Sequence, residues 1–170
     1  MKNLFSLILC FVLVSIYTLA FGAGSSSSVA EDGDKIYHNS RTGSVVRAVT
    51  INFVADDTDG SIPDLTLNNN TTWVTHGSFE GWHLWEVSID CLSGVTPTED
   101  SDIYVYQDAI DLLDGNGVDK VDNTAKAQAY PGIDSSGPYP RPVTDDIVLT
   151  ITQAATATNS ATGSIKLVFK

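Results

Sequence analysis

Residues 91–123, CLSGVTPTEDSDIYVYQDAIDLLDGNGVDKVDN, constrain the fold more than any other stretch, because they join a connector, a strand and a turn in one run. Pro97 fixes its own φ angle, donates no backbone hydrogen bond and favours extended geometry at Thr96. Residues 102–107 then alternate, with Ile and Val on one face and two tyrosines on the other, which predicts a half-buried strand. Asp-Gly-Asn-Gly at 114–117 follows with residues that tolerate positive φ, so the chain is expected to turn there.

The same strand pattern recurs along the chain, and no run beyond the N-terminal apolar segment keeps a helical period. Residues 45–54 alternate over a long strand rich in β-branched residues. The odd-numbered face of this strand is apolar except for Arg47, which we expect near a strand end. Further strands are predicted at residues 61–67, 82–92, 147–152 and 163–169. The last two are expected to pair as a hairpin.

Short strands separated by turn signals predict an all-β sandwich or barrel. We expect a single antiparallel β-sandwich of the jelly-roll or immunoglobulin-like type over residues 43–170, because the connections are short. Pro63 makes the strand at 61–67 an edge strand or one that starts late. Residues 125–146 contain four prolines and are expected to form an extended loop. The predicted buried face of the strand at 82–92 is His83, Trp85, Val87, Ile89 and Cys91.

The N-terminus has the three parts of a secretory signal peptide: a lysine, a mainly apolar run from Leu4 to Phe21, and small residues up to Gly24. Residues 1–23 are therefore expected to be a signal peptide. The protein is then secreted, periplasmic or on the cell surface, without membrane insertion after cleavage. An uncleaved anchor is the alternative, because about 18 apolar residues approach the length that crosses a bilayer.

Residues 24–42 are rich in serine and then polar, and only Ile36 and Tyr37 are suited to packing. This composition predicts a flexible arm. We expect the arm to order on assembly, adding main-chain hydrogen bonds to a sheet edge of a neighbouring copy, with Ile36 and Tyr37 as anchors. A disordered linker that spaces the domain from a membrane or cell wall is the alternative.

The charge of the chain excludes some classes of partner. The chain contains nine Lys and Arg and 21 Asp and Glu, which give a formal net charge of -12. Nucleic acid and anionic membranes need clustered cations, so neither is an expected partner. Removal of the leader leaves Cys91 as the single cysteine, so an internal disulfide is excluded. A lone cysteine in a predicted strand is typically a small buried hydrophobic residue. Intermolecular pairing of Cys91 stays open if the thiol is exposed.

Two groups of residues have metal-binding side chains. His76, Glu80 and His83 have zinc-binding types, but glycines interrupt the segment and its end is a predicted strand. Asp114, Asn116 and Asp119 resemble part of a calcium loop, although position twelve is Ala125 and no carboxylate closes the site. A plain Asx and Gly turn is the favoured interpretation of this loop, and no cofactor is expected.

Trp73, Trp82 and Trp85 concentrate aromatic area in one stretch. Such residues can form a platform for sugars, or they can pack in the core and on a strand face.

No nucleophile elbow or other catalytic signature accompanies the histidines and serines, so the chain is not expected to be an enzyme.

Five motifs follow one another along the chain: Gly43-Ser-Val45, Asp59-Gly-Ser61, Thr96 to Ile103, Ile110 to Asp119 and Thr162 to Leu167. Their order resembles that of a group of small all-β proteins encoded among phage and prophage virion genes. Ser101 stands where these proteins have an aromatic residue, Ala109 stands where they have glycine, and the export signal is an addition. The resemblance implies a compact sandwich with a structural or decorating role, and no catalytic residue.

From these observations we expect an exported, non-enzymatic β-sandwich that acts as a structural or surface-assembly subunit. Its expected partners are further copies of the chain or other surface or virion proteins. The alternative is an extracellular module that binds carbohydrate or calcium.

Overall fold

The computed structural model describes residues 24–91, 94–98, 101–121, 125–134, 137–153 and 158–170. All regular structure within these ranges is β-strand, as the sequence predicts. The strands are β1 (Ser26–His38), β2 (Val45–Val54), β3 (Leu65–Leu67), β4 (His83–Asp90), β5 (Asp102–Gln107), β6 (Ile110–Asp111), β7 (Ala127–Ala129), β8 (Ile133–Asp134), β9 (Gly137–Pro138), β10 (Arg141–Pro142), β11 (Ile147–Thr152) and β12 (Thr162–Phe169).

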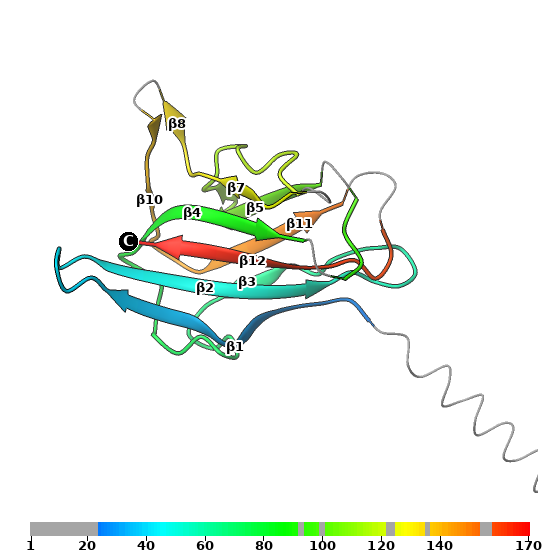
Figure 1. Ribbon diagram of the computed structural model, residues 1–170, viewed down its shortest axis with the longest axis horizontal. Coiled ribbons are helices and arrows are strands. Elements are labelled where there is room, and N and C mark those ends of the chain that lie inside the picture. The colour runs from blue at the N-terminus through cyan, green and yellow to red at the C-terminus, as the bar shows by residue number, and fades with distance from the viewer. Residues whose placement is uncertain (1–23, 92–93, 99–100, 122–124, 135–136, 154–157) are drawn as a thin grey trace, which may run out of the picture.

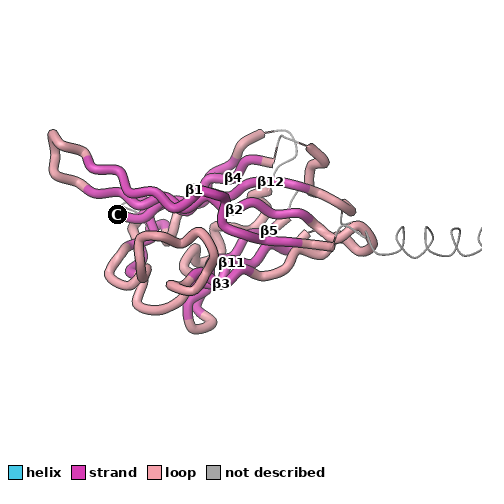
Figure 2. Tube along the Cα trace, turned by 90° about the horizontal axis from the view of Figure 1, so that it is seen from below, coloured by secondary structure: helices cyan, strands magenta, loops and turns pink. Residues whose placement is uncertain are grey.

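Two antiparallel sheets pack together and confirm the predicted β-sandwich. Sheet A has the order β1-β2-β12-β4-β10, with β7 also paired to β4, and sheet B has the order β3-β11-β5-β6. Sheet A faces the viewer in Figure 1, and the view from below shows the two layers (Figure 2). The pair β8 and β9 forms a separate projection at the top of Figure 1.

The core lies between the inner faces of the two sheets. Val49, Ile51 and Phe53 on β2 are buried, which confirms the alternation predicted for residues 45–54. Each such aliphatic or aromatic side chain contributes about 1.5–3 kcal/mol on full burial, so this layer is the main source of stability. The buried apolar residues of the facing and neighbouring strands are Val29, Leu67, Leu84, Val87, Ile89, Ile103, Val105, Ala129, Ile147, Leu149, Ile151, Ile165, Leu167 and Phe169.

Strand β4 contains a β-bulge that reverses part of the predicted burial. Val168 lies opposite Glu86, whereas the next residue, Phe169, lies opposite Leu84, so Trp85 is an extra residue in the ladder. Leu84 therefore points inward, and Trp85 is 38% exposed. The predicted face was right for Val87, Ile89 and Cys91 but wrong for His83 and Trp85. Alternation alone does not reveal an inserted residue.

The predicted flexible arm at 24–42 is wrong, because most of it forms β1. Strand β1 pairs with β2 in two stretches separated by an irregularity between Val29 and Asp34. A Cβ on Gly33 would lie 2.7 Å from the carbonyl oxygens of Ala30 and Thr50, so the bend requires glycine. An edge strand gains backbone hydrogen bonds from one neighbour and needs few apolar side chains, which explains why a polar segment folds here.

The predicted hairpin of residues 147–152 and 163–169 is also wrong. Strand β11 pairs with β3 and β5 in sheet B, whereas β12 pairs with β2 and β4 in sheet A. Both strands alternate in the same way, so the pattern identifies strands but not their partners. Residues 125–146, predicted to be an extended loop, contain four short strands. Strand β3 begins late, after Pro63, and lies at an edge of sheet B, as predicted.

Candidate functional site

The three tryptophans lie in different environments. Trp82 is half-buried against the core, with its ring centroid 6.0 Å from the guanidinium carbon of Arg47. Trp85 lies on the outer face of sheet A, where Lys170 Nζ is 3.6 Å from its ring centroid. Trp73 is 44% exposed on the loop that precedes β4 and has a positive φ of 69°. The predicted sugar platform of all three rings is therefore not assembled.

In the 114–119 loop, the polar side chains hold the turn. The Asp114 carboxylate accepts from Arg141 Nη2 at 3.1 Å, and the Asn116 side-chain amide donates to the Leu113 carbonyl at 2.8 Å. Asp119 has a positive φ of 53°, and its backbone N–H donates to Asp102 Oδ1 at 2.9 Å. These are the contacts of an Asx and Gly turn.

Asp111, which sequence reasoning missed, closes the same loop. Its carboxylate accepts from the backbone N–H groups of Leu113 at 3.0 Å and Gly115 at 2.9 Å. In the sequence, an aspartate shortly before a Gly-rich turn was the signal that its side chain would accept hydrogen bonds from the turn. Among the described residues no group of three or more His, Cys, Asp and Glu could hold a metal ion, and this includes His76, Glu80, His83 and Glu86.

Cys91 lies in the interior. The side chain is fully buried, and burial, with a smaller effect of the neighbouring Asp90 charge, raises the pKa of its thiol to about 12. The thiol is therefore protonated at neutral pH, and its buried position prevents pairing with another copy.

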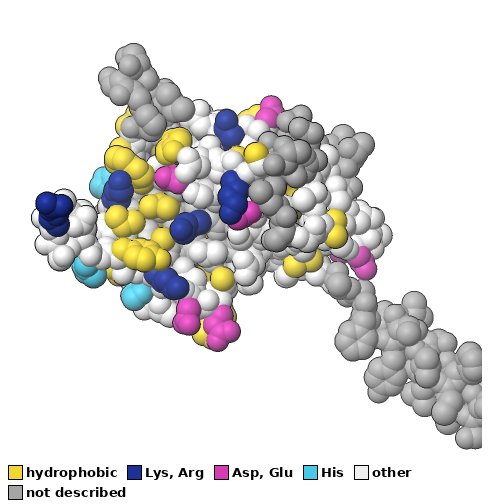
Figure 3. Space-filling model, in the orientation of Figure 1, with side chains coloured by type: hydrophobic (Ala, Val, Ile, Leu, Met, Phe, Trp, Pro, Cys, Tyr) yellow, Lys and Arg dark blue, Asp and Glu magenta, His cyan; other side chains and the backbone are white. Residues whose placement is uncertain are grey.

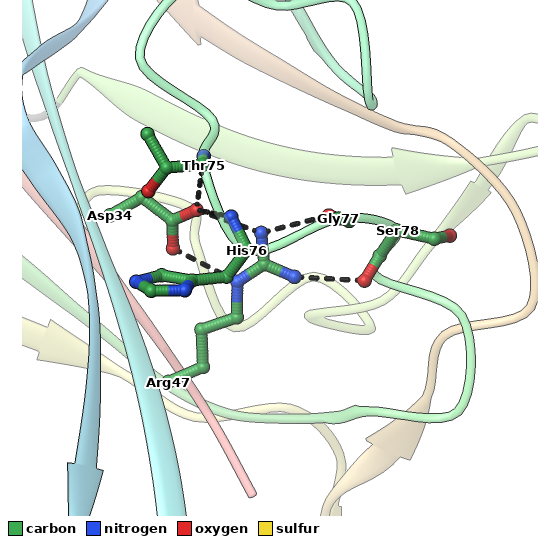
Figure 4. A network of polar contacts seen from close by, with 6 residues as sticks. All are labelled: Asp34, Arg47, Thr75, His76, Gly77 and Ser78. Atoms are coloured by element: carbon green, nitrogen blue, oxygen red, sulfur yellow. Dashed lines mark hydrogen bonds and ion pairs between the residues drawn. The ribbon is translucent and has the colours of Figure 1, made fainter.

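Arg47, expected near a strand end, is fully buried and paired with Asp34 (Figure 4). Its Nε and Nη2 donate to the two carboxylate oxygens of Asp34 at 2.9 and 3.0 Å. Nη1 donates to the Ser78 carbonyl at 2.8 Å, and Nη2 donates also to the Gly77 carbonyl at 3.0 Å. The guanidinium carbon lies 3.9 Å from the ring centroid of Phe79.

Asp34 completes the network from β1. Besides Arg47, it accepts from the backbone N–H groups of Thr75 at 2.8 Å and His76 at 3.0 Å. Burial alone raises the pKa of Asp34, but the hydrogen bonds from Arg47, Thr75 and His76 and the Arg47 charge outweigh burial and lower it. The network therefore ties β1, β2 and the loop before β4 together, and we assign it a structural role. In the sequence, Arg47 on an otherwise apolar strand face was the signal that a buried acidic partner such as Asp34 was needed.

The outer face of sheet A combines apolar side chains with lysines. Tyr37 lies opposite Val46, and Val168 lies next to the bulge that presents Trp85. Tyr37 is 53% exposed, and Ile36, its neighbour in the predicted anchor pair, is half-buried. Figure 3 shows apolar side chains gathered over this sheet, with Lys and Arg and some Asp and Glu among and around them. We call this surface face A and define it by Lys35, Tyr37, Val46, Trp85, Lys166, Val168 and Lys170. Two carboxylates lie on the same side of the sheet: Glu86, opposite Val168, and Asp90, which is paired with Lys126.

The outer face of sheet B has a different character. Ile103 and Val105 point inward, so Asp102, Tyr104 and Tyr106 point outward from β5. The two tyrosine rings stack with centroids 5.5 Å apart and planes 13° apart. The Tyr104 hydroxyl donates to Asp102 Oδ2 at 3.0 Å, and this bond is the main cause that raises the pKa of Tyr104. We call this surface face B and define it by Thr66, Asp102, Tyr104, Tyr106, Val148 and Thr150.

The two sheets differ in where they carry cations. The strands of sheet B contain Asp102 and Asp111 but neither lysine nor arginine. The strands of sheet A contain both signs of charge, with the cations Lys35, Arg47, Arg141 and Lys166 and the carboxylates Glu31, Asp32, Asp34, Glu86 and Asp90. Lys126 and Lys170 lie directly beside strands of sheet A. Four of the nine Lys and Arg of the chain therefore belong to one surface of an acidic protein.

Comparisons of the chain with protein-family models, with curated proteins and with solved structures found no match. Within the described ranges there is no helix with the length and apolar character needed to span a membrane. Function is therefore inferred from the surface of the chain itself.

Proposed function

We propose that this protein is an exported, non-enzymatic structural subunit that assembles with further copies of itself through face A, outside the cytoplasm or on the cell surface. The observation that carries the proposal is the composition of face A. Exposed Tyr37 and Trp85 lie near Val46 and Val168 on the outer side of sheet A. Aromatic residues are enriched in protein interfaces because they bury a large area with few rotatable bonds.

Charge supports self-association through this face in particular. A chain with a formal charge of -12 repels its own copies in most orientations. Four lysines lie on or beside face A, Lys35, Lys126, Lys166 and Lys170, against two carboxylates, Glu86 and Asp90. This local excess of lysine offers an orientation in which the electrostatic interaction with an acidic copy is attractive. The N-terminal signal pattern supports export, and the resemblance to virion proteins supports a structural role.

The direct test is a Trp85→Ala variant, compared with the unmodified protein by sedimentation velocity over a range of concentrations. We expect the variant to weaken self-association by roughly tenfold or more, as loss of a central aromatic anchor does. Trp73→Ala is the matched control, because it removes a tryptophan of similar exposure, 44% against 38%, from a loop. A wild-type protein that stays monomeric at every concentration would refute the proposal.

Carbohydrate binding is a second candidate function, favoured by one observation. A groove of about 490 Å³ lies on sheet A and shares Lys166 with face A. It is lined in part by Thr50, Ser88, Lys126, Gln128 and Lys166, whose polar groups could bind sugar hydroxyls or acids. Calorimetric titration with neutral and acidic oligosaccharides tests this candidate, and binding that Lys166→Ala abolishes would support it.

A further inference from the structure

We infer that face A of one copy docks on face B of the next, so that copies stack head to tail. This inference rests on the proposed function, because it names the partner surface for face A. Its starting point is that the two faces lie on opposite sides of one sandwich (Figure 2). Lysines outnumber carboxylates on and beside face A, whereas face B carries Asp102 and no cation.

Pairing of like faces leaves an excess of one charge in the contact. If face A met face A of another copy, the lysines on and beside the face, Lys35, Lys126, Lys166 and Lys170, would outnumber the carboxylates of Glu86 and Asp90, and this excess of like charge opposes binding. Face B presents Asp102, with Asp111 on the adjacent strand, so pairing of two B faces brings carboxylates together. The combination of A with B brings the excess of lysine to the carboxylates.

The chemistry of the two faces is also complementary. Face B offers the stacked rings of Tyr104 and Tyr106, and a lysine ammonium is attracted to the face of such a ring. Trp85 and Tyr37 of face A supply aromatic partners for the same rings. Val148 of face B lies opposite Tyr106 and gives an apolar contact for Val168.

The position of the faces determines the form of the assembly. A contact between two different surfaces leaves one copy of each surface unused at the ends of the pair. Further copies therefore add at both ends, and the product is an open chain unless the rotation between copies closes a ring.

The test reverses the charge of each face separately. Variant one carries Lys35→Glu and Lys166→Glu on face A, and variant two carries Thr66→Lys and Thr150→Lys on face B. Each variant then has two faces of the same sign, so we expect each alone to associate at least roughly tenfold more weakly than wild type. An equimolar mixture restores both opposite-charge contacts and is expected to assemble again.

Sedimentation velocity of the two variants and their mixture gives the readout, and thermal unfolding of each shows that it is folded. Assembly of variant two like wild type, with loss of assembly only in variant one, would overturn the head-to-tail contact and leave the proposed function standing. A mixture that stays monomeric would also overturn the inference.

A monomeric wild-type protein would instead refute both the contact and the proposed function. If that monomer binds phosphatidylglycerol vesicles and variant one does not, face A is a membrane-binding surface. That result would likewise overturn the docking of face A on face B.

Discussion

Sheets A and B have similar apolar inner layers but keep their charges in different places. Sheet A buries an ion pair, Arg47 with Asp34, at one end of its inner layer and exposes lysines on its outer face. Sheet B has an inner layer without lysine or arginine, and aspartate and tyrosine on its outer face. The same β alternation thus supports two surfaces of opposite character, so the fold class says little about function and the outward positions say more.

Loss of one partner of the buried ion pair is expected to have the largest effect on stability. Asp34→Ala leaves the Arg47 cation buried without its carboxylate, and breaking such a pair costs about 3–5 kcal/mol of unfolding free energy. Urea unfolding measures the change. Asp34→Ala combined with Arg47→Met is the control and should be less destabilised than Asp34→Ala, because no unpaired charge remains. A loss below about 1 kcal/mol in Asp34→Ala would contradict the structural role of the network.

Acid should weaken sheet A through the same carboxylate. The pKa of Asp34 in the folded state lies below its ordinary value of 3.8, so its stabilising contribution is complete above that value. The contribution is lost as the pH falls through the lower, folded-state pKa. Melting temperatures measured from pH 7 to about pH 2 should fall more steeply for wild type than for Asp34→Asn in the acid range. Parallel curves would show that Asp34 is not the group involved.

Loss of the exposed ion pair between Arg141 and Asp114 is expected to have the smallest effect on stability, in contrast to loss of the buried pair. The two side chains are 32% and 61% exposed, and solvent screens such pairs strongly. We expect Arg141→Ala to change the unfolding free energy by less than about 1 kcal/mol. A loss as large as that of Asp34→Ala, measured in the same urea experiment, would show that exposure does not separate these pairs.

Much of the fold follows from local pattern, and the failures share a cause. Alternation predicted the apolar face of β2 and the strand at residues 163–169, because the side chains of a strand alternate locally between its two faces. It did not predict the partner of β11, the bulge at Trp85 or the strand at Ser26–His38, because these depend on neighbours distant in sequence.

The candidate site was less predictable for the same reason. Tyr37 and Trp85 were singled out separately, as an arm anchor and as part of a sugar platform. Only strand order shows that β1, β2, β12 and β4 place them on one face with Val46 and Val168. Lysines at 35, 166 and 170 are far apart in the sequence, and the acidic net charge of the chain gives no indication that they gather on one surface.

Disulfide cross-linking tests the contact between face A and face B most directly. A chain with both Val168→Cys and Thr150→Cys carries one thiol on each face, while buried Cys91 stays unreactive. Mild oxidation of the assembled protein, followed by a non-reducing gel, should give a ladder of covalent multimers from this chain, and only monomer from either single variant. Dimers formed by Val168→Cys alone, without a ladder from the double variant, would contradict head-to-tail stacking.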